Sequence, residues 1–224
     1  PEQGSIPILA EDFRPGPISS DPHFLAATDT FIYLAAQLES RIWYLWNLPQ
    51  ALTQAKVLGW LDPGPLSAES FRCVLLPDDR LFYYQSRGIW QSDGTEQGTR
   101  EVISFYEVNN LWNTGDIKAL GAGFVFVGID EEHGREPWFS DGTVENSFML
   151  RDIQPGEASS GITQFVFHGG HIYFAADTPE KGRELWITDG TPEGTRLVKD
   201  IAPGPAAGDP YNYCSTHDAL FFVA

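Results

Sequence analysis

The sequence predicts an all-β protein of the β-propeller class, in which short four-stranded antiparallel sheets form the blades. Three observations lead to this fold class. A tryptophan-centred segment recurs, with Trp90, Trp138 and Trp186 each 48 positions apart. Each copy alternates apolar and polar side chains, as half-buried strands do, and each contains a glycine turn. A repeat of this length that contains strands and turns is typical of propellers with one blade per repeat.

The clearest copy runs from Gly182 to Pro205, with the sequence GRELWITDGTPEGTRLVKDIAPGP. Glu184 to Thr188 alternates as a strand and stops at an Asp-Gly turn, and Thr195 to Ile201 follows as a second strand. We expect Gly190 to take a positive φ at low steric cost. We expect Asp189 to close the turn through hydrogen bonds to nearby backbone N–H groups.

The remaining copies repeat this hairpin with increasing divergence. They are Gly134 to Gly156, Gly88 to Thr99, and a faint copy around Leu45-Trp46 that lacks the Asp-Gly-Thr turn. A further hairpin precedes each of them, so every unit has four strands in series. One unit leaves an apolar face uncovered, and neighbouring units therefore have to stack on it. The predicted blade units are 23–62, 71–106, 117–153, 164–201 and 211–224.

The two ends of the chain match different parts of one unit. Leu9 to Pro17 (LAEDFRPGP) overlays Leu197 to Pro205 (LVKDIAPGP), whereas 211–224 resembles the first hairpin of a unit. We expect residues 6–13 to pair with this hairpin and close a single propeller domain of five blades, because an open end exposes strand edges. The rival interpretation is a piece of a longer array, cut within a repeat.

The repeated residues resemble the bacterial ELWxxDGT repeat proteins. The resemblance is carried by three Trp–Asp-Gly-Thr segments and by the trailing Asp-Ile-x-Pro-Gly motif that starts at Asp152 and Asp200. It covers about Gly88 to Pro205 well and the first third poorly. The resemblance implies a propeller-like array in proteins that are exported or displayed at a bacterial cell surface, with the periplasm as a second compartment. It implies no reaction and no catalytic residue.

Charge and hydropathy exclude several function classes. The formal net charge is −17, which repels nucleic acid and anionic lipid. No apolar run approaches the roughly 18 residues of a membrane span, so we expect no membrane insertion. Cys73 and Cys214 are expected on first strands of their units as separate buried thiols, and a bridge between them would need their Cα atoms within about 7 Å.

Two groups of side chains are candidate metal ligands. Asp93, Asp141 and Asp189 recur in acidic turns that could bind calcium, but each turn offers one carboxylate where calcium takes about six to eight oxygens. His168 and His171 flank a Gly-Gly turn at a spacing suited to zinc or copper, without a third ligand nearby. We therefore expect turn closure from the aspartates, surface turn positions for the histidines, and no cofactor.

Two tryptophans outside the repeat frame are candidates for a binding surface. Trp60 stands where other copies have aspartate, and Trp112 lies in the connection between two units. The sequence contains no recognisable catalytic motif, so we expect a non-enzymatic module that binds a protein or a glycan. The alternatives are a glycosidase or lyase with acidic residues at the channel mouth, and a structural subunit of a larger surface complex.

Overall fold

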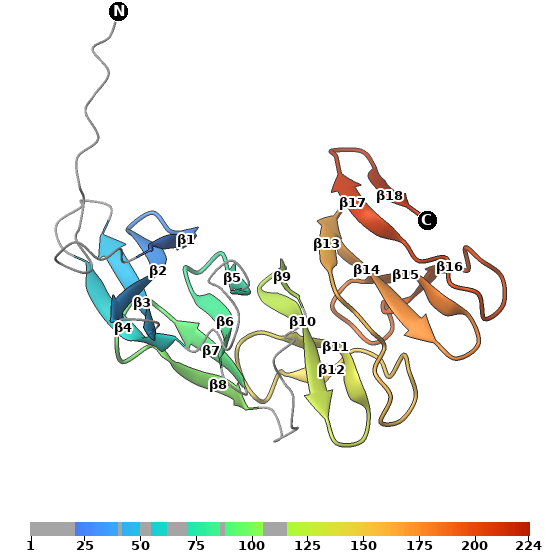
Figure 1. Ribbon diagram of the computed structural model, residues 1–224, viewed down its shortest axis with the longest axis horizontal. Helices are drawn as coiled ribbons and strands as arrows, with labels where there is room; N and C mark the ends of the chain where they lie inside the picture. Colours follow the sequence, from blue (N-terminus) through green and yellow to red (C-terminus); the bar gives the residue numbers. More distant parts are fainter. Residues whose placement is uncertain (1–20, 40–41, 50–54, 62–70, 86–87, 105–115) are drawn as a thin grey trace, which may run out of the picture. The chain divides into compact units, whose positions relative to one another are not determined.

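The computed structural model describes residues 21–39, 42–49, 55–61, 71–85, 88–104 and 116–224. Over these ranges the protein is all-β, with antiparallel strands and no helix (Figure 1). A helix long and apolar enough to cross a membrane is therefore absent from the described part of the chain. In the described ranges, four sheets have four strands each and a fifth has two, as expected of a propeller-like fold.

We name the sheets A to E in chain order. Sheet A contains β1 (His23–Ala27), β2 (Phe31–Glu39), β3 (Ile42–Pro49) and β4 (Lys56–Leu61). Sheet B contains β5 (Cys73–Leu75), β6 (Leu81–Gln85), β7 (Gly88–Ser92) and β8 (Arg100–Ser104). Sheet C contains β9 (Ile117–Leu120), β10 (Gly123–Asp130), β11 (Gly134–Ser140) and β12 (Phe148–Met149). Sheet D contains β13 (Phe165–His168), β14 (His171–Thr178), β15 (Gly182–Thr188) and β16 (Arg196–Lys199). Sheet E contains β17 (Tyr211–Ser215) and β18 (Leu220–Val223).

Within every four-stranded sheet, strands that follow one another in sequence are hydrogen-bonded neighbours. This is the four-strands-in-series arrangement that the repeat predicts. In sheet D the central pair aligns Phe174 with Trp186, and the pairing of β15 with β16 shifts register after Leu185. The segment 41–60 has a sequence that could also suit a helix. Its described residues form strands β3 and β4, as the overlay on the later copies predicts.

Contacts divide the chain into two compact units, which we describe separately. The first is 1–71 with 92–100, and the second is 72–91 with 101–224. In the first unit, sheet A buries a small core of Ala36, Trp46, Leu48 and Ala55. The Asp-Gly-Thr turn at 93–95 belongs to this unit, where the Asn47 amide donates to the Gly94 carbonyl over 2.7 Å.

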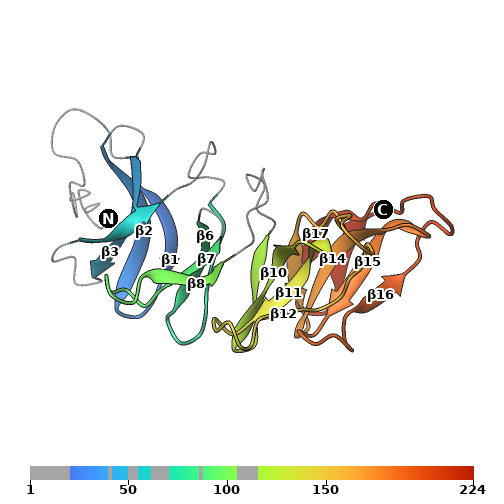
Figure 2. The same ribbon diagram turned by 90° about the horizontal axis from the view of Figure 1, so that it is seen from below.

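In the second unit, the first strands β5, β9, β13 and β17 contact one another in succession. Apolar cores fill the spaces between sheets, as stacking of incomplete repeats requires. One core joins sheets B and C, where the rings of Phe82 and Phe124 lie 4.7 Å apart. A second joins sheets C and D, which stack face to face around Phe165, Phe174 and Trp186 (Figure 2).

The glycine of the Asp-Gly-Thr turn packs against the preceding sheet. Gly142 has φ +94°, and a Cβ atom there would lie 2.5 Å from the Phe82 ring. Gly190 has φ +90°, and its Cβ would lie 3.2 Å from a Leu120 methyl group. Glycine is therefore needed twice over, for its backbone conformation and for the close approach between sheets.

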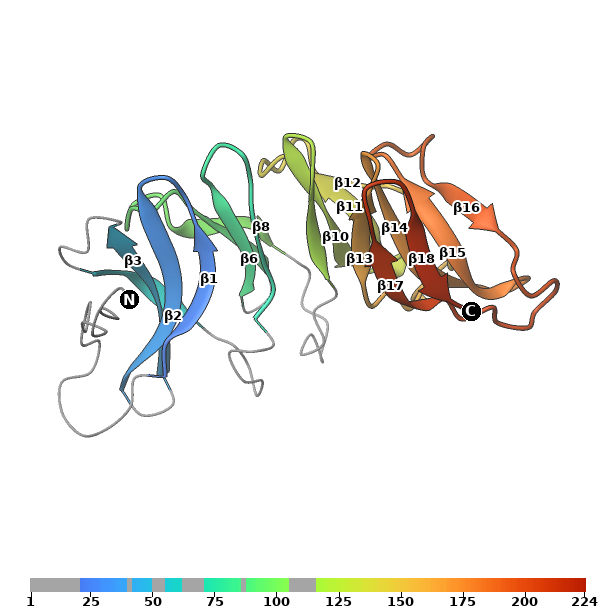
Figure 3. The ribbon, with the colours of Figure 1, turned by 90° about the horizontal axis from the view of Figure 1, so that it is seen from above.

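The hairpin β17–β18 lies beside β13 (Figure 3). Its apolar side chains Tyr211, Phe221 and Val223 are 51%, 59% and 46% exposed. The strand predicted at 6–13 lies outside the described residues, so closure of the ring and a count of five blades stay predictions.

Candidate functional site

The turn aspartates make their hydrogen bonds inside their own turns. In sheet D, the Asp189 carboxylate accepts from the Thr191 backbone N–H over 2.9 Å and from its hydroxyl over 2.7 Å. The Thr191 hydroxyl hydrogen bond lowers the pKa of Asp189, and burial acts in the opposite direction. Asp93 and Asp141 accept the same pair of bonds from Thr95 and Thr143. The expected turn-closing role is confirmed.

A glutamate two residues before tryptophan has a structural role that sequence reasoning did not assign. The buried Glu184 carboxylate accepts backbone hydrogen bonds from Ile201 over 2.8 Å, and from Ala202 and Gly208 over 3.1 Å each. These donors lie on the connection from sheet D to sheet E. Because buried N–H groups need partners, Glu184 fixes the path by which the chain leaves one sheet and enters the next.

Glu136 repeats this arrangement in sheet C, 48 positions earlier. Its carboxylate accepts from the backbone N–H groups of Ile153, Gln154 and Ser160 over 3.0, 3.3 and 3.1 Å. Burial raises the pKa of Glu136 to about 7, while hydrogen bonds from Ile153, Ser160 and Gln154 act in the opposite direction. The repeated carboxylates are therefore parts of the frame, and their repetition reflects the repeated connection between sheets.

The two histidines lie opposite each other across their turn, as β13 and β14 pair His168 with His171. The Nδ1 atom of His168 is 3.1 Å from the Ser215 hydroxyl, and that of His171 is 3.0 Å from the Gly169 carbonyl oxygen. In the described ranges, no group of three or more His, Cys, Asp or Glu side chains is placed to hold a metal ion. Metal binding at these histidines or at the turn aspartates remains untested.

Trp60 lies on β4 at the edge of sheet A and is 50% exposed. Its proposed contact with a partner stays a prediction, and Trp112 lies outside the described residues. Cys73 and Cys214 lie on first strands, β5 and β17, and both are free thiols. The expectation that both thiols are buried is wrong: Cys73 is half-buried, with burial raising its pKa to about 11, and Cys214 is exposed.

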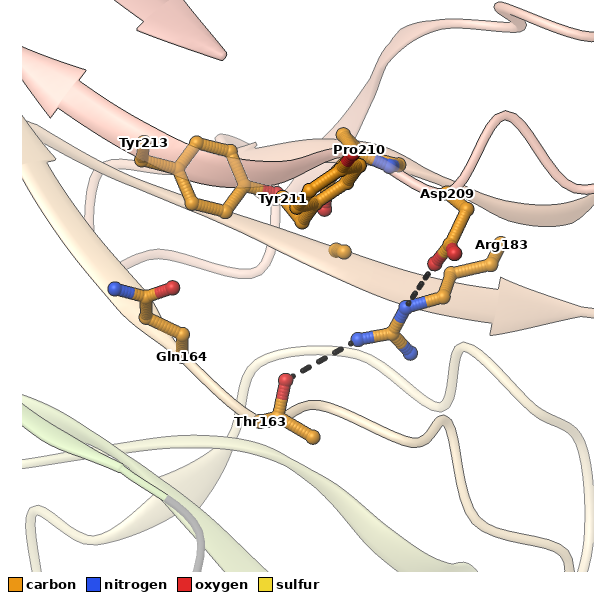
Figure 4. Close-up of a pocket in the computed structure, with 8 residues that line it drawn as sticks. Thr163, Gln164, Arg183, Asp209, Pro210, Tyr211 and Tyr213 are labelled. Carbon is orange, nitrogen blue, oxygen red and sulfur yellow. Dashed lines mark hydrogen bonds and ion pairs between the residues drawn. The ribbon is translucent and has the colours of Figure 1, made fainter. Parts of the chain in front are cut away.

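A cavity of about 320 Å³ opens between sheets D and E, where the chain enters their first strands. Small-ligand sites typically begin at about 300 Å³. Tyr211, Tyr213 and Pro210 form one wall, and Arg183 lies on the facing side (Figure 4). The other residues around the cavity are Thr163, Gln164, Ala175 and Asp209.

The Arg183 side chain is held rigidly beside this cavity. Its guanidinium lies 2.9 Å from the Asp177 carboxylate and 3.4 Å from that of Asp209. It also donates to the Gly161 carbonyl over 2.8 Å and to the Thr163 hydroxyl over 3.3 Å. Four oxygen partners from different segments preorganise the polar wall, which reduces the ordering cost of binding a ligand.

The cavity forms where the repeat is broken. Asp116, at the start of sheet C, accepts a hydrogen bond of 2.8 Å from the Phe165 backbone N–H and so joins β9 to β13. One repeat later, at an offset of 48 positions, Gln164 takes the place of Asp116 and Tyr213 takes the place of Phe165. Both of these later residues line the cavity. Phe165 is buried in the core between sheets C and D, whereas Tyr213 is half-buried. The contact between β9 and β13 is therefore filled, whereas the matching position between β13 and β17 holds the cavity.

The backbone around the cavity is strained on both sides of Pro210-Tyr211. Asp209 has φ +45° and Asn212 has φ +52°, in the left-handed region that non-glycine residues seldom adopt. Strained residues of this kind cluster at binding and active sites. These residues were not predicted, because the features shared by the copies do not mark them. Differences between aligned copies, such as Asp209 against Gly161 and Tyr211 against Thr163, were the signal that could have found them.

No family model matches the sequence, and a comparison with curated proteins finds no match. Similar solved structures include a mutant puromycin hydrolase in a complex, with a TM-score of 0.51 and 14% identity over 86% of this chain and 31% of that chain. A structure from a study of two prolyl endopeptidases has a TM-score of 0.52 and 11% identity over 89% of this chain and 30% of that chain. The chain thus spans about a third of the length of either, and at these identities the likeness shows a propeller-like fold alone.

Proposed function

We propose that the protein is a non-enzymatic binding module in which the cavity beside Arg183 contacts a protein or glycan partner. The observation that carries this proposal is the break in the repeat. Repeated carboxylates such as Glu184 and Asp189 bond to backbone N–H groups of the frame. By contrast, residues that depart from the repeat, such as Asp209 and Tyr211, line the cavity beside Arg183, which itself matches Arg135 of the preceding copy. Function on a shared fold depends on such local departures.

The same proposal includes the finer architecture and the compartment. The resemblance to ELWxxDGT repeat proteins supports export or display at a bacterial surface. The overlay of residues 9–17 on 197–205 supports a five-bladed ring in which residues 6–13 pair with sheet E. Removing residues 1–20 should then lower the melting temperature and increase amide exchange at Leu220 to Val223. An unchanged exchange rate at this hairpin would reject the closure.

The similar structures carry names of enzymes, a hydrolase and endopeptidases. The Asp177 and Asp209 carboxylates are both in ion pairs with the Arg183 guanidinium. Because these pairs engage both acidic groups beside Arg183, they favour a binding role over acid–base catalysis. The test is a parallel screen of the whole protein for binding to glycan and peptide arrays and for turnover of glycosidase, lyase and peptidase substrates. Binding without turnover is expected, and turnover that Arg183→Ala abolishes would reject the proposal.

A second candidate role is that of a structural subunit of a larger surface complex. The exposed apolar side chains of sheet E favour it, because contiguous apolar surface commonly marks an interface. Native mass spectrometry over a concentration series is the test. A stable oligomer that Phe221→Asp dissociates would support this role, and a monomer throughout would speak against self-assembly.

A further inference from the structure

We propose that the cavity between sheets D and E binds a single neutral hexopyranose unit of a glycan. This inference rests on the proposed binding function and names its ligand class. The cavity volume of about 320 Å³ suits a single sugar ring, because it is near the lower limit of small-ligand sites. The residues that build the cavity come from the loops that precede β13 and β17, from β17 itself, from β14 and from the start of β15.

The two walls of the cavity differ in chemistry. Tyr211, Tyr213 and Pro210 offer aromatic and apolar surface on one side, and Arg183, Thr163 and Gln164 offer polar groups on the other (Figure 4). A pyranose ring has the same two-sided character. Its C–H groups can pack on an aromatic face, while its hydroxyl groups point outward around the edge of the ring.

The polar wall supplies both donors and acceptors. The Arg183 guanidinium only donates, the Asp209 carboxylate only accepts, and the Gln164 amide and the Thr163 hydroxyl do both. A sugar hydroxyl both donates and accepts, so it can use this mixed set. Asp209 is 69% exposed at its side chain, so one of its oxygens is open to a ligand while the other faces Arg183.

Charge argues against an ionic ligand. The Arg183 cation lies between the Asp177 and Asp209 carboxylates, and the whole chain has a formal net charge of −17. An anionic sugar would meet this repulsion, as like charges disfavour association. A cation would have to compete with the guanidinium for the same two carboxylates. The neutral ligand is the one that leaves the ion pairs intact.

The Tyr213 hydroxyl does not compete for the ligand, because it donates to the Pro210 carbonyl over 3.0 Å. Burial raises the pKa of Tyr213 to about 12, so the phenol is neutral at physiological pH. Tyr213 thus stiffens the strained turn at Pro210-Tyr211, and Tyr211, half exposed, is the ring that is free to stack on a sugar.

The test is a calorimetric and NMR titration of the whole protein with defined hexasaccharides. The neutral probes are cellohexaose, maltohexaose and N-acetylchitohexaose, and the anionic probe is hexagalacturonate. We expect binding of at least one neutral probe and none of hexagalacturonate. Tyr211→Ala should weaken that binding about tenfold or more, which corresponds to about 1.4 kcal/mol. Tyr211→Phe should retain it, since the ring stays.

Phe167→Ala is the matched control, because Phe167 is an exposed aromatic residue on β13 that does not line the cavity. It should leave saccharide binding unchanged, and circular dichroism should show all variants folded. Saccharide binding that Tyr211→Ala and Gln164→Ala do not weaken, or a preference for hexagalacturonate, would overturn the inference.

The outcomes also separate this inference from the proposed function. A protein that binds none of the saccharides but binds an arrayed peptide in a manner sensitive to Tyr211→Ala would overturn the ligand class and keep the binding role. A protein that binds neither saccharides nor peptides would overturn both.

Discussion

Sheets A and D have the same four strands in the same order, yet different side chains hold them. Sheet D has Glu184 and an Asp-Gly-Thr turn, whereas Tyr44 stands in sheet A at the position that matches Glu184. The shared tryptophan is buried in both, at Trp46 and Trp186. This difference indicates that alternating apolar residues suffice to form the sheet, while Glu184 and Asp189 fix the connections of sheet D.

The largest effect is expected at the residue that sheet D has and sheet A lacks. Glu184→Ala leaves the N–H groups of the buried Gly208 and of the half-buried Ile201 and Ala202 without their acceptor, at about 1 to 3 kcal/mol for each such group. We expect a loss of at least about 3 kcal/mol in the free energy of unfolding, measured by urea denaturation. Glu193→Ala, an exposed glutamate of the same hairpin, is the control and should stay within about 0.5 kcal/mol. A similarly small loss for Glu184→Ala would show that water replaces the carboxylate.

The shared tryptophan gives the next effect. Trp186 is 5% exposed in the core between sheets C and D, with the Arg151 guanidinium 5.6 Å from its ring centre. Trp186→Ala should cost about 3 to 5 kcal/mol, because it opens a cavity in a packed core. Trp60→Ala, at the exposed edge of sheet A, should cost below about 1 kcal/mol. Equal losses in a thermal melt would contradict the difference in burial.

The turn of sheet D allows a finer test. Gly190→Val places a β-branched residue at φ +90° and against Leu120, which should cost about 2 to 3 kcal/mol. Asp189→Ala removes hydrogen bonds in an exposed turn and should cost about 1 kcal/mol. The order of the two losses in urea denaturation is the result to check. The reverse order would mean that the carboxylate, and not the glycine, determines the turn.

The smallest effect concerns pH. The Thr191 hydroxyl hydrogen bond lowers the pKa of Asp189 in the folded state. A carboxyl group with a lowered folded pKa adds stability that is present above its unfolded pKa of about 3.9 and is lost as pH falls through the folded value. The stability difference between the native protein and Asp189→Ala should therefore be full at pH 7 and shrink below about pH 4. A difference that is independent of pH would exclude this charged hydrogen bond.

Much of the fold follows from the sequence, because strand alternation and turn chemistry are local. The four strands in series are found in sheets A to D as predicted, and Gly190 has the predicted positive φ. The role of Glu184 was not predicted, since its donors lie 17 to 24 positions away on a connection without regular structure. Pairings at that range depend on the path of the whole chain.

The cavity was missed for a related reason. It depends on residues from four separate segments, and each of them looks ordinary by itself. Asp116 and Gln164 both precede a first strand, but only the structure shows that Asp116 bonds to the next first strand while Gln164 lines a space. A comparison of copies position by position would have marked the difference without explaining it.

The most direct measurement is amide hydrogen exchange at Ile201, Ala202 and Gly208 in the native protein and in Glu184→Ala, which removes both acceptor oxygens. If buried carboxylates hold the connections between sheets, these three amides are protected in the native protein and exchange much faster in the variant, while the amides of β14 and β15 change little. Fast exchange at the three amides in the native protein would show that Glu184 does not hold the connection.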